Sequence, residues 1–351
     1  MLYIRTDGNA KIGTGHIMRC LSIADAYKKQ GGEVAFICAD KTMLPLIADR
    51  GYSIYSLGSE WNRLESELNE LTAMIASENI KELLIDSYFV TEKYLKELKE
   101  LTTVIYIDDL DAFNYPCDML INYNCYANDL NYPKKYPNTK LILGCEYVPL
   151  REEFKRTSYR STKKEVQSIL ITMGGTDPHN IAYLLAEMLK IKEATEHFEL
   201  KIIAGRLNPH IGKLNKLAVK YEGICICSDV KNMSELMMTC DIAISAGGST
   251  LYELCACGVP TVVFSFADNQ QRAVRTFGEG YMINAGDVRD DEILCIKAIL
   301  EGVTRLSSDY KLRCDMSKKI RALVDGNGAD RVAKAILEFS TSQSNTIHYI
   351  S

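Results

Sequence analysis

The sequence of 351 residues lacks the features that mark several large classes of protein. No apolar stretch approaches the roughly 18 residues that span a bilayer, so we expect no membrane insertion. The chain opens directly with a strand-like segment that contains Arg5 and Asp7, so we expect no signal peptide. It also lacks an excess of positive charge, with a formal net charge of −5 and a pI near 5.7. This argues against nucleic acid as a partner, because the phosphate backbone requires a clustered basic surface.

The 12 cysteines lack the spacing of a disulfide framework, and the pattern Cys-x-x-Cys does not occur. Cys38 and Cys240, among others, stand in apolar runs, where a free thiol packs as a small hydrophobic group. Free thiols in this number indicate a reducing compartment, and we therefore expect the protein in the cytoplasm.

The sequence also lacks the common motifs for metals and nucleotide cofactors. Its five histidines, at positions 16, 179, 197, 210 and 348, show no metal-ligand spacing. Neither Gly-Lys-Ser/Thr nor Gly-x-Gly-x-x-Gly is present. We therefore predict no metal site and no bound cofactor.

What is present is the composition of a globular protein, with 47% hydrophobic and 25% charged residues, in a chain long enough for two domains. Short apolar runs alternate with segments of helical periodicity, which is typical of a parallel sheet covered on both faces. The predicted strands are residues 2–5, 34–38, 82–86, 103–107, 119–121, 140–143, 166–172, 200–204, 224–227, 241–245 and 261–265.

The strand–helix pattern is interrupted once. Residues 151–165 are rich in charge and indicate an exposed linker, after which the pattern restarts with a strand, a glycine-containing turn and a helix. We predict an α/β fold of two Rossmann-like domains, residues 1–150 and 166–339, that face a cleft, with a polar and frayed tail at 340–351. Open sheets of this class bind ligands beyond the carboxyl ends of their strands.

The first glycine loop runs from Asp7 to His16. Gly13 and Gly15 allow a tight turn and a close approach of the backbone to a ligand, although a plain strand-to-helix connection needs no more than this. His16 stands at the start of the next helix, where the positive helix end favours an unprotonated ring suited to a general base. A capping or surface histidine is the alternative.

The second glycine loop follows a predicted buried strand and contains Gly247, Gly248, Ser249 and Thr250. Backbone amides and hydroxyls at a helix start can hold a diphosphate without a metal. Glu253, in the first turn of that helix, can accept hydrogen bonds from ribose hydroxyls. A simple N-cap with a capping glutamate is the alternative, but it leaves the double glycine without a purpose.

Further candidates lie in other loops. Asn269 and Gln270 form part of a polar cluster after the strand at 261–265. Gly174 and Gly175, in the turn at 173–178, can add backbone amides to the diphosphate site. Tyr88 follows the strand at 82–86 and can point into the cleft, with a surface tyrosine as the alternative. Asp108 and Asp109 are adjacent and would point to opposite sides, so they are not a ready carboxylate pair.

Six segments together resemble a known family. They are RTDGNAKIGTGHIMRC at 5–20, IDSY at 85–88, YVPLREEF at 147–154, MGGTDP at 173–178, and ISAGGSTLYELCACGVP with FADNQ between 244 and 270. The chain resembles the UDP-2,4-diacetamido-2,4,6-trideoxy-β-L-altropyranose hydrolases of pseudaminic acid biosynthesis. That family is similar in fold to GT-B glycosyltransferases, especially the N-acetylglucosaminyltransferase of peptidoglycan synthesis.

The resemblance implies that His16 is the catalytic base. It places UDP against Gly247, Gly248, Ser249 and Glu253, and it implies that Tyr88, Arg151 and Asn269 lie near the sugar. The implied reaction is attack of an activated water on the anomeric carbon with inversion, without a metal. A GT-B glycosyltransferase that uses a UDP-amino sugar donor is the alternative, and a non-catalytic sensor of sugar nucleotides is a third possibility that would leave His16 without a use.

Overall fold

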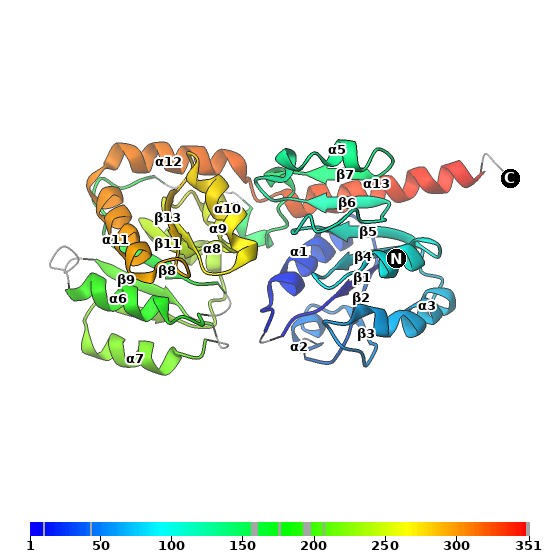
Figure 1. Ribbon diagram of the computed structural model, residues 1–351, viewed down its shortest axis with the longest axis horizontal. Helices are drawn as coiled ribbons and strands as arrows, with labels where there is room; N and C mark the ends of the chain where they lie inside the picture. Colours follow the sequence, from blue (N-terminus) through cyan, green and yellow to red (C-terminus); the bar gives the residue numbers. More distant parts are fainter. Residues whose placement is uncertain are drawn as a thin grey trace. The chain divides into compact units, whose positions relative to one another are not determined.

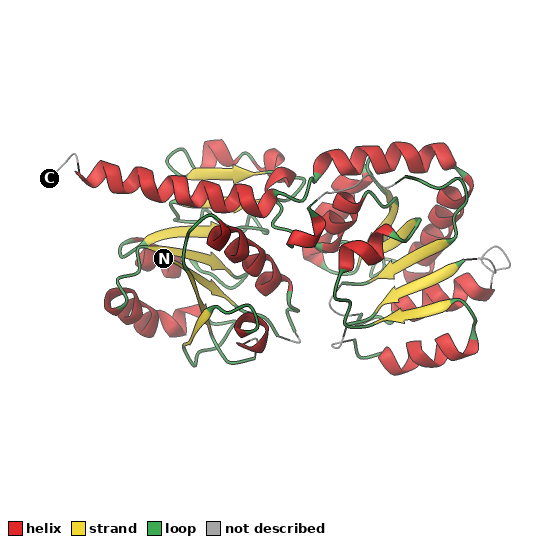
Figure 2. Cartoon of the chain, turned by 180° about the vertical axis from the view of Figure 1, so that it is seen from behind, coloured by secondary structure: helices red, strands yellow, loops and turns green. Residues whose placement is uncertain are grey.

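The structure is a computed structural model that describes residues 1–9, 11–42, 44–155, 161–174, 177–191, 198–205 and 208–348. Its contacts divide the chain into two compact units (Figure 1). The first unit is Met1–Arg151 together with Asn327–Ser351, and the second is Glu152–Gly326. Each unit contains one parallel sheet with helices packed against it (Figure 2). The predicted α/β class with two Rossmann-like domains is therefore confirmed.

In the described part of the first unit, one parallel sheet has the strand order β3-β2-β1-β4-β5-β6-β7. Its strands are β1 Leu2–Thr6, β2 Val34–Cys38, β3 Ser53–Ser56, β4 Glu82–Asp86, β5 Thr103–Ile107, β6 Met119–Asn122 and β7 Lys140–Leu143. Its helices are α1 Gly15–Lys29, α2 Leu44–Ala48, α3 Leu68–Ser77, α4 Glu92–Lys99, α5 Tyr132–Lys135 and α13 Gly328–His348, with short 3₁₀ turns η1 Leu64–Glu67, η2 Ala127–Leu130 and η3 Cys145–Tyr147.

In the described part of the second unit, the strand order is β10-β9-β8-β11-β12-β13. The strands are β8 Ser168–Thr172, β9 Glu199–Ile203, β10 Ile224–Cys227, β11 Ile242–Ala246, β12 Thr261–Ser265 and β13 Ile283–Asp287. The helices are α6 Ile181–Ile191, α7 Ile211–Lys220, α8 Met233–Met238, α9 Thr250–Cys257, α10 Asp268–Gly278, α11 Glu292–Ser308 and α12 Tyr310–Leu323, with η4 Glu152–Phe154.

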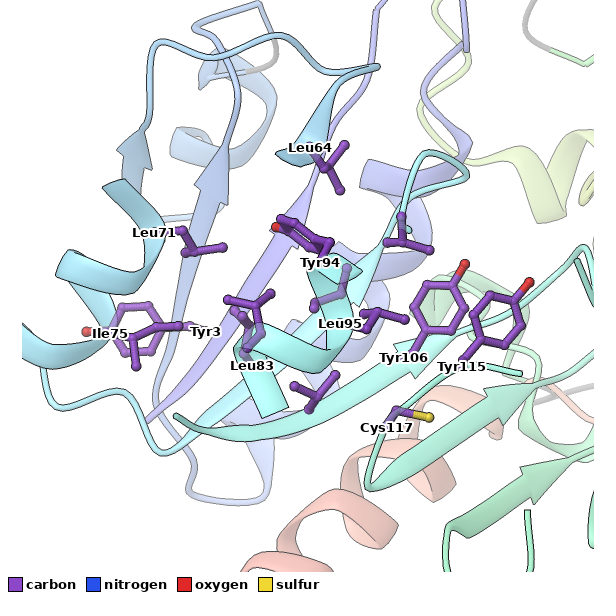
Figure 3. Packing of buried hydrophobic residues seen from close by; sticks show 14 of the residues in the cluster. Tyr3, Leu64, Leu71, Ile75, Leu83, Tyr94, Leu95, Tyr106, Tyr115 and Cys117 are labelled. Carbon is purple, nitrogen blue, oxygen red and sulfur yellow. The ribbon is translucent and has the colours of Figure 1, made fainter. Parts of the chain in front are cut away.

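The core of the first unit explains why these segments form strands. Central strands such as β1 and β4 are buried almost throughout and carry three apolar residues each, because helices cover both of their faces. On one face, sheet residues such as Leu83 and Tyr106 pack against Leu71 of α3 and against Tyr94 and Leu95 of α4 (Figure 3). Burial of each such side chain contributes about 1.5–3 kcal/mol to folding.

The strand order brings distant loops together. The order reverses between β1 and β4 in the first unit and between β8 and β11 in the second, and ligands of open α/β sheets bind at such switch points. Thr6, at the end of β1, pairs with Asp86, at the end of β4. Ser245 of β11 pairs with Thr172 of β8 in the same way. The two predicted glycine loops therefore each follow a strand at a switch point.

Three features differ from the sequence predictions. The strands β3 and β13 were not predicted, because both are short edge strands with mixed burial and carry little apolar alternation. Residues 327–339 were assigned to the second domain, yet they belong to the first unit, where α13 packs against α1 (Figures 1 and 2). Residues 340–348, expected to be a frayed tail, continue α13 as helix.

Candidate functional site

The glycine loop after β1 is closed by Asn9. The backbones of Asn9 and Gly13 form a bridge, and the Asn9 side chain accepts hydrogen bonds from the amides of Lys11 and Ile12. Gly13 has a φ of +73°, a conformation that L-residues with a side chain rarely adopt. Gly15 begins α1, and a Cβ added there would meet no described atom within 4 Å. The loop therefore leaves open space directly before His16.

His16 is buried, and its ring is held by the neighbouring strand. Its Nδ1 lies 2.7 Å from Oδ1 of Asp86, at the carboxyl end of β4. Arg19, one turn further along α1, donates from Nε to Oδ2 of Asp86 at 2.6 Å and from Nη2 to Oδ1. The thiol of Cys20 also donates to Oδ2. Three residues of one helix thus converge on a single carboxylate.

The protonation state of Asp86 determines which nitrogen of His16 is available. Burial raises the pKa of the Asp86 carboxyl, but the charge and hydrogen bonds of Arg19, with those of His16, outweigh burial and hold that pKa well below its usual range. An ionised Asp86 accepts a hydrogen bond, so Nδ1 of His16 carries the proton. Within the described residues the close polar contacts of the ring, with Oδ1 of Asp86 and with Nη2 of Arg19, both involve Nδ1, which leaves Nε2 to accept a proton.

Asp109, which follows β5, binds the guanidinium of Arg19 at Nη1. Its Oδ2 accepts from Nη1 of Arg19 at 2.6 Å and from the hydroxyl of Tyr88 at 3.1 Å. The ring of Tyr88 meets the ring of His16 edge to face, with 4.4 Å between centroids. The prediction that Asp108 and Asp109 do not act as a pair agrees with their contacts, since Asp108 instead accepts from Tyr132.

In the second unit, the loop between β11 and α9 contains the predicted nucleotide residues. Gly247 is buried, and an added Cβ would lie 2.4 Å from Cγ2 of Val274 and 3.0 Å from Cβ of Gln270. Close packing of α10 therefore accounts for this glycine without a ligand. Gly248 has open space around its Cα. Ser249 is exposed and makes no side-chain cap, which removes the simple N-cap alternative and leaves the first amides of α9 without a side-chain acceptor from Ser249.

Residues near this loop take up different roles. Thr250 begins α9, and Glu253 lies half-buried in its first turn. Asn269 is exposed in the first turn of α10. Gln270 uses its side-chain oxygen to accept from the amide of Phe266. The 247–250 loop lies next to α10, since a Cβ added to Gly247 would lie 3.0 Å from Cβ of Gln270.

The loop after β8 offers less to an anion. Both carboxylate oxygens of Asp177 accept from amides at the start of α6, those of Ile181 and Ala182, at 2.9 and 3.0 Å. The amide of Gly174 donates to Oγ1 of Thr172 at 3.3 Å. The start of α6 is therefore already occupied by a side chain. The candidate Gly175 lies outside the described residues, and Arg151 is half-buried at the end of the first segment of unit one.

The sequence is similar to those of known proteins, and this similarity shows the family of the chain. The chain is 30% identical over 257 residues to the UDP-2,4-diacetamido-2,4,6-trideoxy-beta-L-altropyranose hydrolase of Campylobacter jejuni, covering 71% of this chain and 85% of the relative. The chain belongs to this hydrolase family. It is also 26% identical over 348 residues to the spore coat polysaccharide biosynthesis protein SpsG of Bacillus subtilis, covering 95% of this chain and 97% of that one.

The fold has a solved counterpart. The structure of MurG from Acinetobacter baumannii superposes with a TM-score of 0.67 at 16% identity, covering 96% of this chain and 99% of that one. This likeness confirms the predicted GT-B-like fold. No protein-family model matches the chain.

The described residues contain neither a metal-binding cluster nor a helix that could span a membrane. Among the described residues, no group of three or more His, Cys, Asp or Glu side chains is placed to hold a metal ion. Within the same residues, no helix combines the length and apolar character needed to cross a bilayer.

Arg19 and Asp86 are not among the functional residues predicted from the sequence, and Asp109 entered that prediction only as half of a rejected pair. One signal was available for Arg19, because residues three apart on a helix share a face and Arg19 follows His16 by three. Asp86 and Asp109 end or follow apolar strands, but nothing local showed that these strands neighbour β1. Their role depends on the strand order.

Proposed function

We propose that the chain hydrolyses a UDP-linked 2,4-diacetamido-2,4,6-trideoxy sugar and supplies the free sugar to pseudaminic acid biosynthesis. In this proposal Nε2 of His16 takes a proton from water, and the oxygen of that water attacks the anomeric carbon. The bond from this carbon to the diphosphate oxygen breaks, UDP leaves with the electron pair, and the configuration inverts. No cofactor or metal takes part.

The observation that carries the proposal is the contact between Asp86 and Nδ1 of His16. A general base needs a ring that is oriented, in one tautomer, with its second nitrogen available. Asp86 meets the first two requirements, and the free Nε2 meets the third. Family membership supports the same reaction and substrate.

The proposal assigns the nucleotide to the second unit. Gly247, Gly248, Ser249 and Thr250 bind the diphosphate through amides and hydroxyls, which stabilise the leaving group. Glu253 binds the ribose. The remaining candidates, with smaller expected contributions, are Gly13, Gly15, Tyr88, Arg151, Gly174, Gly175, Asn269 and Gln270.

The test of the base is His16→Asn, assayed against a panel of UDP- and GDP-linked diacetamido sugars. Loss of a general base lowers turnover by about 10² to 10⁴-fold, whereas UDP binding measured by calorimetry should stay close to that of the unmodified protein. A His16→Asn variant with near-native turnover would remove the assignment.

The bond that breaks is tested by reaction in ¹⁸O water. Attack at carbon places the label in the sugar, and attack at phosphorus places it in UDP. We expect the label in the sugar, because donors around the diphosphate favour its departure rather than its attack by water. Mass gain in UDP would overturn the mechanism.

A glycosyltransferase that uses a UDP-amino sugar donor is the second candidate, favoured by the MurG-like fold. The two functions differ in the acceptor. UDP release at full rate without any added acceptor supports the hydrolase, and release that depends on an acceptor supports the transferase.

A further inference from the structure

We propose that Arg19 keeps the ring of His16 uncharged in the resting protein, so that Asp86 can orient the base through Nδ1 without holding a second proton on Nε2. This inference rests on the proposed role of His16 as the base. It adds a positioning residue that acts through His16 and Asp86.

The geometry of the three side chains carries the inference. Nη2 of Arg19 lies 3.0 Å from Nδ1 of His16. Because Nδ1 carries the proton that faces Asp86, this contact sets a cation against the ring, and protonation of Nε2 would place two positive charges side by side in a buried site. Charges are screened weakly in such surroundings. Arg19 therefore opposes charging of the ring.

Arg19 also limits how strongly the charge of Asp86 favours the protonated ring of His16. A carboxylate beside an imidazole normally favours the imidazolium form. Here both oxygens of Asp86 are shared with the guanidinium, through Nε at 2.6 Å and through Nη2. The carboxylate thus keeps its directional hydrogen bond to His16, while Arg19 neutralises its charge.

Arg19 is itself fixed and permanently charged. Burial lowers the pKa of its guanidinium, but the charges of Asp109 and Asp86 outweigh burial and raise that pKa well above its usual value. Asp109 and the hydroxyl of Tyr123 both accept from Nη1. A cation held from two sides cannot turn away from the ring.

Among the described residues, the charged and titratable groups around the ring come from five places in the first unit. Helix α1 contributes Arg19 and Cys20, and β4 contributes Asp86. The segments after β4, β5 and β6 contribute Tyr88, Asp109 and Tyr123. Burial, with the charge of Asp109, raises the pKa of Tyr88 well above its usual value, and burial likewise raises that of Tyr123, so both stay neutral. The balance therefore depends on one cation and two carboxylates.

The balance of charges around His16 predicts that its titration midpoint shifts in opposite directions when Arg19 or Asp109 is neutralised. Removal of the Arg19 charge in Arg19→Met leaves two carboxylates near the ring, so His16 should bind its proton more tightly. Removal of the Asp109 charge in Asp109→Asn should weaken proton binding. Arg19→Lys keeps a cation at this place and is the matched control for charge.

The experiment is an NMR titration of the His16 ring in the full chain, with the signal assigned by its loss in His16→Asn. In Arg19→Met the midpoint should rise by about 1 pH unit or more, the scale of a nearby charge. In Asp109→Asn it should fall. In Arg19→Lys it should stay closer to that of the unmodified protein than in Arg19→Met. The acid limb of the kcat/KM profile should move in the same directions.

A folded Arg19→Met variant with an unchanged midpoint would overturn the inference, because a purely structural role moves stability and not the titration. If circular dichroism shows that Arg19→Met does not fold, Asp109→Asn decides, and an unchanged or raised midpoint there contradicts the inference. The titration needs no substrate. Absence of UDP-sugar hydrolysis in the unmodified protein would therefore overturn the proposed function separately.

Discussion

The loops after β1 and after β11 share one pattern, a buried strand followed by glycines and a helix, but their polar groups are organised differently. Around the first loop, side chains from α1, β4 and the segment after β5 form a connected set with Asp86 and Arg19 at its centre. Around the second loop, Ser249 makes no cap. The contacts around the first loop orient one side chain, His16. We propose that the first loop serves the reaction and the second binds the nucleotide, although the two share one sequence pattern.

A second comparison lies within the second unit. The helices α6 and α9 both follow a glycine-containing loop at the carboxyl edge of the sheet. Asp177 covers the first amides of α6 with a carboxylate, whereas Ser249 makes no side-chain cap at α9, where the amides of Leu251 and Tyr252 donate to the backbone carbonyls of Gly248 and Ser249. A carboxylate at a helix start competes with any bound anion. Of the two helix starts, we therefore propose α9 as the diphosphate site.

The largest expected effect concerns the first loop. Asp86→Asn removes the charge that selects the tautomer of His16, and we expect kcat to fall by about 10² to 10⁴-fold. UDP binding should change little, because the proposal assigns UDP to the second unit. Steady-state kinetics with calorimetric UDP titration measures both. Equal losses in turnover and UDP affinity would contradict the division of roles.

The next effect concerns Gly247 and Gly248. Gly247→Ala places a methyl group against Val274, and overpacking of this kind costs about 1–3 kcal/mol of stability. Gly248→Ala is the control, because its Cβ meets open space, and its stability should stay near that of the unmodified protein. Chemical denaturation measures both. Equal stability of the two variants would show that the contact with α10 does not require glycine.

A smaller expected effect is the difference in stability between variants at the start of α6 and at the start of α9. Asp177→Ala removes two hydrogen bonds to the start of α6 and should cost about 1 kcal/mol of stability. Ser249→Ala removes no cap and should leave stability unchanged within about 0.5 kcal/mol, while it weakens UDP binding. The reverse order of the two stabilities would remove the distinction between α6 and α9.

The smallest expected effect is that of chelation. The proposal holds the diphosphate with amides and hydroxyls, so exhaustive treatment with EDTA should leave turnover within error of the untreated protein. Loss of activity that magnesium or manganese restores would show that the second loop does not act alone on the diphosphate.

The sequence by itself determined the local elements and the fold class. Short apolar runs marked most of the strands, since a strand covered on both faces is largely apolar. The glycines and His16 stood out because loops before helices are read from neighbouring residues. The strand β3 was missed because only two apolar residues stand between its serines, whereas the edge strands β7 and β10 have apolar sequences and were predicted.

Only the tertiary structure decided which residues surround His16. Asp86 is 70 positions from His16, and Asp109 is 90 from Arg19. They meet because β4 pairs with β1 and β5 lies next to β4, and no local pattern encodes that order. The same holds for Gly247, whose packing reason is Val274 on a later helix. Periodicity and loop chemistry act over a few residues, whereas hydrogen bonds and close packing depend on where strands and helices meet in space.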